Sequence, residues 1–172
     1  GLERGQIVSL RVNILETGRE RAAIENECIW KREQADAPIK DKRRITISAP
    51  SAEKFQIDFD ITMEMLMDVT IEKTNHSLFS ARIDPDLAVI NGGTMIDAEG
   101  NSEEKGTFGK SAGWIDCYGT RMNKSEGIAI LQHPSNYWYP SPWFTRDYGF
   151  FSPTPMFWPP NDKAITLKKG ES

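Results

Sequence analysis

The sequence has 172 residues, enough for one domain of ordinary size, and 38% of them are hydrophobic while 27% are charged. These proportions exclude a fibrous or wholly disordered chain and predict a folded, soluble protein. The 21 basic residues are outnumbered by 25 acidic ones, so the net charge of −4 offers no basic surplus to nucleic acid or anionic lipid. No apolar run approaches the roughly 20 residues that span a bilayer. We therefore expect neither a nucleic-acid partner nor a membrane partner.

Alternation of apolar and polar residues dominates the first half of the chain and predicts β-strands. It is uninterrupted at 55–65, where we expect one of the longest strands, with a single buried face. Residues 19–35 include good helix formers, and Ile24, Cys28 and Trp30 fit the alternation of a strand about as well as a helical stripe. Shorter alternating segments, separated by turn-forming residues, lie at 8–14, 45–47, 69–71 and 79–83.

Two further strands are expected at 114–119 and 127–133, joined by a polar turn at 120–126 that closes a hairpin. No segment has a convincing helical period. Many short strands separated by turns are typical of an antiparallel β-sandwich, so we predict an all-β fold in a single domain over 1–172.

The last third of the chain is rich in proline and aromatic residues. Seven of the ten prolines lie within 134–160, together with ten aromatic residues. Prolines at this density prevent continuous ladder bonding, so we expect an ordered, extended loop there. Each aromatic ring either anchors the loop on the core or stacks on a ligand such as a sugar, whose apolar C–H face matches an aromatic face.

The cysteines and one basic run are two further features of the sequence. Cys28 and Cys117 are the only cysteines, too few for a disulfide scaffold, and we expect buried, unpaired thiols, with a single disulfide as the alternative. The basic run from Lys40 to Arg44, broken by Asp41, indicates a solvated strand edge.

A series of motifs from residue 73 onward occurs in one order: Asn75-His76-Ser77-Leu78-Phe79 with Arg82, then Asp97-Ala98-Glu99-Gly100, then Gly109-Lys110 with Trp114-Ile115-Asp116, then His133-Pro134-Ser135-Asn136 with Pro142-Trp143 and Arg146-Asp147-Tyr148-Gly149. With these motifs the chain resembles the bacterial family labelled "methane oxygenase PmoA-like". The resemblance implies an all-β sandwich, comparable with the supersandwiches of sugar mutarotases, and it favours a strand at 19–35. It also implies a role in bacterial carbohydrate catabolism, in the cytoplasm or the periplasm. Oxygenase activity is not expected, because a copper site would need several imidazoles and the sequence has two histidines.

Members of that family begin with a His-rich segment ahead of the strand at Val8, and nothing in this sequence matches it. Tyr139 and Phe144 also stand where relatives carry histidines. The resemblance therefore implies the C-terminal part of a longer domain, with an incomplete sheet edge. We expect a second polypeptide or self-association to cover that edge.

Acid/base chemistry on a sugar or modified glycoside is the first functional hypothesis. His133 follows a predicted strand and His76 lies at a turn before another, so both are candidates for proton transfer. Glu99 and Asp116 are their candidate carboxylate partners, because environments that differ can divide acid and base roles. A divalent metal held by the two histidines would need the same carboxylates.

The candidate substrate-binding residues surround these motifs. Arg146 and Asp147 are adjacent, so on an extended chain they point to opposite faces and each needs another partner. A planar arginine fork could hold a substrate carboxylate or a pair of hydroxyls, or could instead bind loop carbonyls. The other candidates are the polar Asn136 and Lys110 and the stacking rings of Trp143 and Trp138. The alternative functions are a non-catalytic carbohydrate-binding or scaffolding sandwich and an accessory subunit that completes a partner's active site.

Overall fold

The computed structural model describes residues 5–74, 79–155 and 164–172, and these form two compact units. The first unit holds the residues up to Thr70 and those from Thr166 onward, and the second holds residues 71–165. Among the described residues, 57% lie in strands and 7% in helices. This composition, with antiparallel pairing in every sheet whose register is defined, confirms the all-β prediction.

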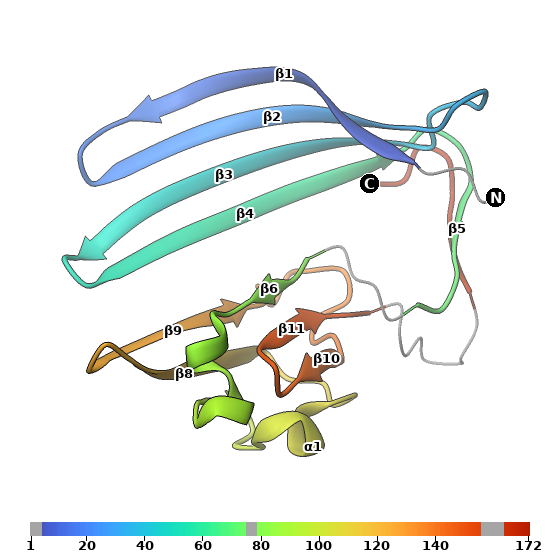
Figure 1. Ribbon diagram of the computed structural model, residues 1–172. Helices are drawn as coiled ribbons and strands as arrows, with labels where there is room; N and C mark the ends of the chain where they lie inside the picture. Colours follow the sequence, from blue (N-terminus) through green and yellow to red (C-terminus); the bar gives the residue numbers. More distant parts are fainter. Residues whose placement is uncertain (1–4, 75–78, 156–163) are drawn as a thin grey trace. The chain divides into compact units, whose positions relative to one another are not determined.

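Four long strands form the main sheet of the first unit, paired in sequence order (Figure 1). They are β1 (Gln6–Thr17), β2 (Arg21–Lys31), β3 (Ile39–Ser51) and β4 (Lys54–Met65). The alternating segment at 55–65 is strand β4, as expected, but the buried face predicted for it is largely exposed, with Phe55 at 76%, Ile57 at 51% and Phe59 at 45%. The segment at 19–35 contains strand β2, as the resemblance implies. Each strand folds back on the one before it through a short connection, which is the arrangement that alternation with interspersed turns predicts.

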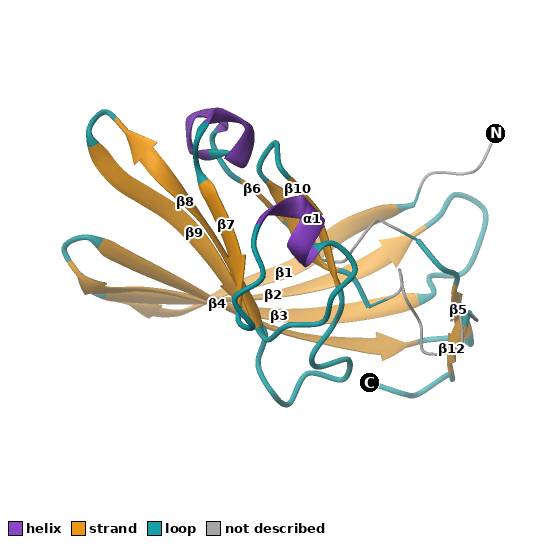
Figure 2. Cartoon of the chain, turned by 90° about the horizontal axis from the view of Figure 1, so that it is seen from below, coloured by secondary structure: helices purple, strands orange, loops and turns teal. Residues whose placement is uncertain are grey.

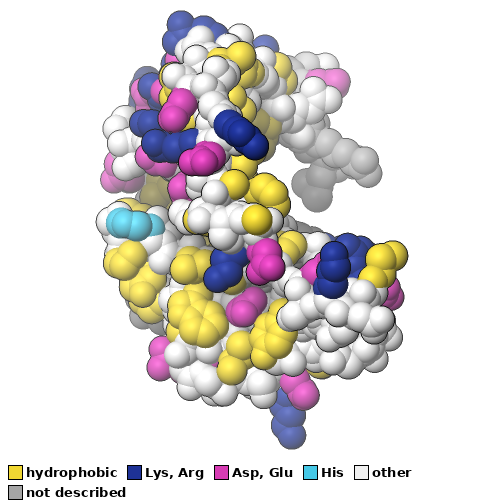
Figure 3. Space-filling view, turned by 90° about the vertical axis from the view of Figure 1, so that its left-hand side faces the viewer, with side chains coloured by type: hydrophobic (Ala, Val, Ile, Leu, Met, Phe, Trp, Pro, Cys, Tyr) yellow, Lys and Arg dark blue, Asp and Glu magenta, His cyan; other side chains and the backbone are white. Residues whose placement is uncertain are grey.

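The register of this sheet separates an apolar face from a charged face. Ile14, Ile24, Ile45 and Phe59 are paired in one row across all four strands. The opposite face holds ion pairs between neighbouring strands, among them Arg11–Glu27 at 2.8 Å and Lys42–Glu25 at 2.8 Å. Figure 3 shows acidic and basic side chains next to one another over this sheet. Exposed pairs of this kind contribute about 0–1 kcal/mol each, so their main effect is to favour this register.

The last residues of the chain return to the end of β4. Strands β5 (Val69–Ile71) and β12 (Ile165–Leu167) pair with each other. Beyond β12, Gly170 N–H donates to the Met65 carbonyl at 2.8 Å, and Met65 N–H donates to the Glu171 carbonyl at 2.9 Å. These bonds satisfy backbone groups at the end of β4 that would otherwise be unpaired.

The second unit contains two three-stranded sheets around one core. One sheet has the order β7 (Thr94–Asp97), β8 (Trp114–Arg121), β9 (Lys124–Leu131), and the other has the order β10 (Trp143–Arg146), β11 (Phe150–Pro153), β6 (Ala81–Arg82). The short helices η1 (Pro85–Leu87), η2 (Val89–Asn91) and α1 (Glu103–Thr107) lie in the connections (Figure 2). Both sheets supply core side chains, including Ile83, Met95, Ile115, Trp143 and Phe151.

Two connections differ from the sequence-based expectation. The proline-rich region was predicted to be extended loop, but β10 and β11 form a hairpin in it, with Trp143 opposite Pro153. The prediction was wrong there because the stretch 143–152 contains no proline, so nothing blocks its ladder bonds. The expected turn at 120–126 is tighter than predicted, with Met122 and Asn123 at φ of 51° and 60°, the positive values of a two-residue hairpin turn.

In the described parts of the chain, every helix is too short and too polar to cross a lipid bilayer.

Candidate functional site

One end of the β7–β8–β9 sheet gathers several of the sequence-predicted site residues. Strands β7 and β9 end there and β8 begins there, because Asp97 pairs with Ile115 and Trp114 pairs with Leu131. Pairing continues one step further, with Gln132 N–H donating to the Gly113 carbonyl at 2.9 Å. The loops that carry Glu99, Lys110 and His133 therefore meet at this end of the sheet, which we call the rim.

The segment 132–143 crosses the rim and is held by side-chain hydrogen bonds. The amide of Gln132 donates to the Ala112 carbonyl at 2.9 Å and accepts from Ser141 N–H at 3.1 Å. Ser141 Oγ donates to the Trp138 carbonyl at 2.8 Å. Tyr139 packs closely over Gly113, since a Cβ at that position would lie 2.9 Å from the Tyr139 hydroxyl oxygen. This aromatic segment thus rests on a fixed scaffold although it is not a strand.

His133 is exposed at the start of this segment, and its ring has a defined hydrogen-bonding role. Its Nδ1 lies 2.7 Å from Ser135 Oγ and accepts from Ser135 N–H at 3.2 Å. A backbone N–H can only donate, so Nδ1 is the acceptor and the neutral ring carries its proton on Nε2. His133 therefore presents an N–H donor to solvent at the rim.

The aromatic residues of the segment divide into exposed rings and a core ring. Tyr137 is 79% exposed, and it packs edge to face on the half-buried Trp138 with ring centroids 5.1 Å apart. Trp143, predicted as a stacking surface, is instead fully buried, and its indole N–H donates to the Ala112 carbonyl at 2.8 Å. The prediction for Trp143 needs correction, because its ring belongs to the hydrophobic core of the second unit and leaves no face open to a ligand.

Arg146 and Asp147 both bind Glu104, a residue that the sequence analysis did not single out. Arg146 Nη1 donates to Glu104 Oε1 at 2.8 Å, and its guanidinium lies 4.3 Å from the Phe144 ring centroid. Asp147 Oδ1 accepts from Glu104 N–H at 2.7 Å, and Asp147 N–H donates back to Glu104 Oε2 at 3.2 Å. These bonds fasten α1 to the β10–β11 turn. Arg146 and Asp147 therefore both have a partner within the protein, and the substrate-binding role of the two residues stays a prediction.

Glu99 and Lys110 lie at a turn that a buried aspartate organises. Asp97 is 2% exposed, and its Oδ1 accepts from the backbone N–H groups of Glu99 and Asn101, each at 2.9 Å. Lys110 Nζ donates to Asn101 Oδ1 at 3.0 Å. The Glu99 side chain itself is exposed, as is that of Asn136 in the 132–143 segment.

Asp116 is a partly buried carboxylate in the middle of β8. It pairs with Ile96 on one side and Ala129 on the other, so its neighbours across the sheet are apolar. Desolvation by this burial raises the pKa of Asp116 above its ordinary value. Ala129 and His133 are four residues apart, about 13 Å along a strand, which is too far for direct proton exchange between Asp116 and His133. The predicted acid/base set is therefore not assembled by these two residues.

Two further predictions concern metal and thiol chemistry. His76 lies outside the described residues. Among those that are described, no three histidine, cysteine, aspartate or glutamate side chains are placed to hold a metal ion. Cys28 and Cys117 are free and buried, which confirms the expectation of unpaired thiols. Burial, with a smaller contribution from Asp116, raises the pKa of Cys117 to about 11.

The first unit holds a buried charged cluster that the sequence analysis missed. Asp41 is 1% exposed, and Arg43 binds it through two bonds, Nε to Oδ1 at 2.6 Å and Nη2 to Oδ2 at 2.9 Å. Trp30 Nε1 donates to Asp41 Oδ2 at 2.6 Å. Burial alone would raise the pKa of Asp41, but the hydrogen bonds from Arg43 and Trp30 outweigh it and hold the pKa below its ordinary value.

The prediction of a solvated edge was thus wrong for part of the basic run. Asp41 and Arg43 have the same strand parity as Ile39 and Ile45, so they belong to the apolar face of the sheet. That parity was the available signal. An aspartate and an arginine two residues apart among apolar positions indicate a buried pair.

The fold and the rim define an all-β antiparallel protein with an exposed aromatic segment on a rigid sheet end. The chain belongs to a family of unknown function, DUF6807, whose family model matches residues 2–172. Comparisons with curated proteins and with solved structures found no match.

Proposed function

We propose that this protein binds carbohydrate at the rim, through residues 133–139. The observation that carries the proposal is the Tyr137 ring, 79% exposed and supported edge to face by Trp138. A large aromatic ring left in solvent loses the benefit of burial, which a stacked pyranose would restore. The exposed donors of His133 and Asn136 flank this ring in sequence and supply hydrogen bonds for sugar hydroxyls.

The hydrogen bonds of the segment favour binding by reducing its entropic cost. Gln132 and Ser141 fix the backbone on either side of the rings before any ligand arrives. Each side chain or loop that must become ordered on binding costs roughly 0.5–1.5 kcal/mol, so a scaffold already ordered keeps more of the contact energy. Because it is already ordered, the rim is suited to a ligand that gains little contact energy on binding, such as a sugar.

A second candidate function is acid catalysis on the bound sugar by Asp116. The raised pKa of this carboxyl favours the protonated form that a general acid needs. Asp116 shares a face of β8 with Trp114, which begins the strand at the rim, and lies about 7 Å further along it. A bound oligosaccharide is long enough to extend from the rim to this carboxyl.

Ligand-observed NMR with a panel of oligosaccharides tests the binding proposal. The panel would contain cellohexaose, xylohexaose and trigalacturonate, and saturation transfer from the protein is expected for at least one of them. Asp116→Asn separates binding from catalysis, because a protein that only binds keeps its affinity, whereas an enzyme that uses Asp116 as its acid loses turnover with binding largely retained. Absence of transfer to every sugar of the panel would count against the proposal.

A further inference from the structure

A pocket at one end of the main sheet of the first unit lies outside the rim. It has a volume of about 300 Å³ and is lined by Gly5, Gln6, Ile7, Trp30, Lys31, Arg32 and Pro38. Ile7 and Trp30 are paired across β1 and β2, so they stand side by side on the apolar face. This volume is at the lower end of the range for small-molecule sites, which suits a ligand about the size of one sugar ring.

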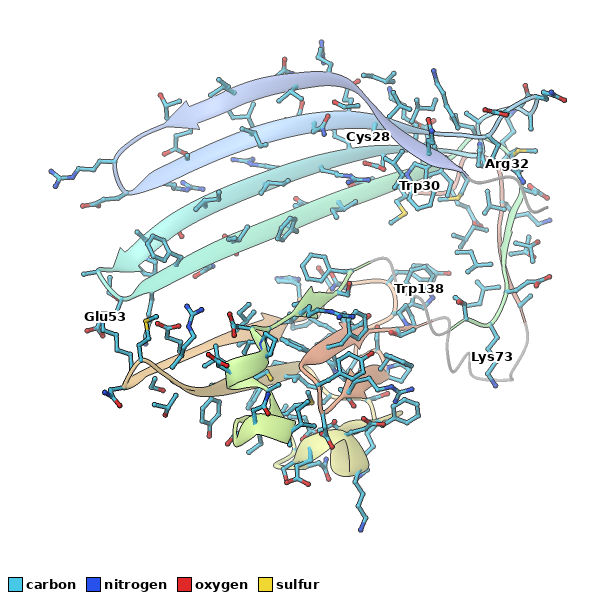
Figure 4. The ribbon with its side chains drawn as sticks, in the orientation of Figure 1. Cys28, Trp30, Arg32, Glu53, Lys73 and Trp138 are labelled. Carbon is cyan, nitrogen blue, oxygen red and sulfur yellow. The ribbon has the colours of Figure 1, made fainter. Side chains whose placement is uncertain are left out.

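The Trp30 ring is held in one orientation by a hydrogen bond to Asp41 on the neighbouring strand β3. Its only polar atom donates to Asp41 Oδ2 at 2.6 Å, and Asp41 is in turn fixed by Arg43. Trp30 therefore needs no hydrogen bond from a ligand and offers the pocket an apolar ring surface. Figure 4 shows Trp30 and Arg32 at the same end of β2. A ring fixed in this way pays little entropy when a flat ligand stacks on it.

The two charged residues that line the pocket are both basic. Lys31 and Arg32 are exposed, neither has an ion-pair partner among the described residues, and no acidic residue contributes to the lining. Arg32 directly follows β2, which ends at Lys31, and forms an isolated bridge with Ala35. Its Cγ lies 3.8 Å from the position that a Cβ on Gly5 would occupy, which places the stem of the side chain along the start of β1.

We infer that this pocket binds an acidic pyranose, that is, a sugar with a carboxylate such as a uronate. The C–H face of the ring stacks on Trp30 beside Ile7, and the carboxylate meets the Arg32 guanidinium, whose planar fork matches carboxylate geometry. Lys31 adds to the positive potential at the mouth. The inference does not depend on the rim, because every lining residue belongs to the first unit.

The test compares D-glucuronate with D-glucose, which differ in the carboxylate alone. Titration calorimetry on the full chain is expected to give glucuronate at least a tenfold advantage in affinity. Arg32→Gln should reduce glucuronate affinity to about that of glucose, while Arg19→Gln, a change at an exposed arginine outside the pocket, should leave it unaltered. Trp30→Phe should weaken binding of both sugars, and its thermal unfolding would be recorded to show that the variant is folded.

Three outcomes would overturn the inference. Equal affinity for glucose and glucuronate would remove the charge selectivity on which it depends. Competition by acetate as effective as that by glucuronate would indicate a general anion contact and no sugar site. Loss of glucuronate binding in Tyr137→Ala, with Arg32→Gln unaffected, would place the acidic sugar at the rim. Unchanged oligosaccharide affinity in Tyr137→Ala would contradict the proposed function at the rim, but it would not bear on the inference about this pocket.

Discussion

The indole N–H of Trp30 donates to the Asp41 carboxylate at 2.6 Å on the apolar face of a four-stranded sheet. The same carboxylate accepts two bonds from Arg43, so one buried acid has three donors on its two oxygens. An ionised carboxylate survives burial only with such partners, because each unpaired charge in a protein interior costs several kcal/mol. The Trp30–Asp41–Arg43 cluster thus links sheet stability to the orientation of a pocket-lining ring.

Removing the charge of Asp41 should destabilise the first unit. Asp41→Asn keeps an oxygen that can accept from Trp30, but it leaves the Arg43 guanidinium without its counter-charge. We expect a loss of about 3 kcal/mol in the free energy of unfolding, measured by urea denaturation. Asp60→Asn, on an exposed position of β4, is the matched control and should change stability by less than about 0.5 kcal/mol. Equal effects of the two substitutions would show that the cluster contributes nothing specific.

The pH dependence of the same variant has a defined sign. The folded-state pKa of Asp41 lies below its ordinary value of 3.8, so its stabilising contribution is present above pH 3.8 and is lost as pH falls through the folded pKa. The difference in unfolding free energy between the wild type and Asp41→Asn should therefore shrink under acid. A difference that stayed constant from pH 7 to pH 2 would contradict this assignment.

Asp116 should behave in the opposite way. Its folded-state pKa is raised by desolvation, so the folded state binds the proton more tightly and the unit loses stability as pH rises through that pKa. Asp116→Asn removes this penalty, and we expect the variant to match or exceed the wild type in melting temperature at pH 7. Below pH 3.8, where both forms are neutral, the advantage should disappear. A variant that is less stable than the wild type at pH 7 and equal to it in acid would contradict a raised pKa of Asp116 in the folded state.

Both cysteines should resist alkylation in the folded protein. Burial raises the pKa of Cys117 to about 11 and also raises that of Cys28, and the reactive species is the thiolate. Incubation with iodoacetamide at pH 8, followed by intact-mass measurement, should show little modification without denaturant and two adducts in urea. Rapid labelling of either thiol in the native state would mean that local opening of the fold exposes that thiol to the reagent.

The sequence was sufficient where structure depends on local alternation. Strand β4 follows from side-chain period alone, although its apolar residues Phe55, Ile57 and Phe59 are exposed, so alternation predicted the strand and not the burial of its face. Strand β2 also needed the family resemblance, because its period fits a helix about as well as a strand. The hairpin of β10 and β11 was missed because we considered the proline content of 134–160 as a whole. Its centre, residues 143–152, has no proline, and its backbone can therefore form ladder hydrogen bonds. Local rules also predicted the free thiols, which need only a buried strand position.

The site was harder to predict because its partners are distant in the sequence. Arg146 binds Glu104, 42 residues away, and Trp143 binds the Ala112 carbonyl, 31 residues away. Such contacts decide whether an arginine is free for a substrate or whether a tryptophan is a core residue, and no spacing rule contains them. Tyr137 is exposed and Trp138 is half-buried, and both precede β10, whose first residue is the fully buried Trp143.

The most direct measurement of the central claim is the affinity of Tyr137→Ala for whichever oligosaccharide of the panel binds the wild type. Titration calorimetry should show a loss of about tenfold or more, because stacked aromatic contacts contribute roughly 0.5–1.5 kcal/mol beyond the area that they bury. Phe55→Ala is the matched control, since Phe55 is 76% exposed against 79% for Tyr137 and lies in β4 of the first unit. The account predicts that this control keeps wild-type affinity. Unchanged affinity in Tyr137→Ala, or an equal loss in Phe55→Ala, would contradict carbohydrate binding at the rim.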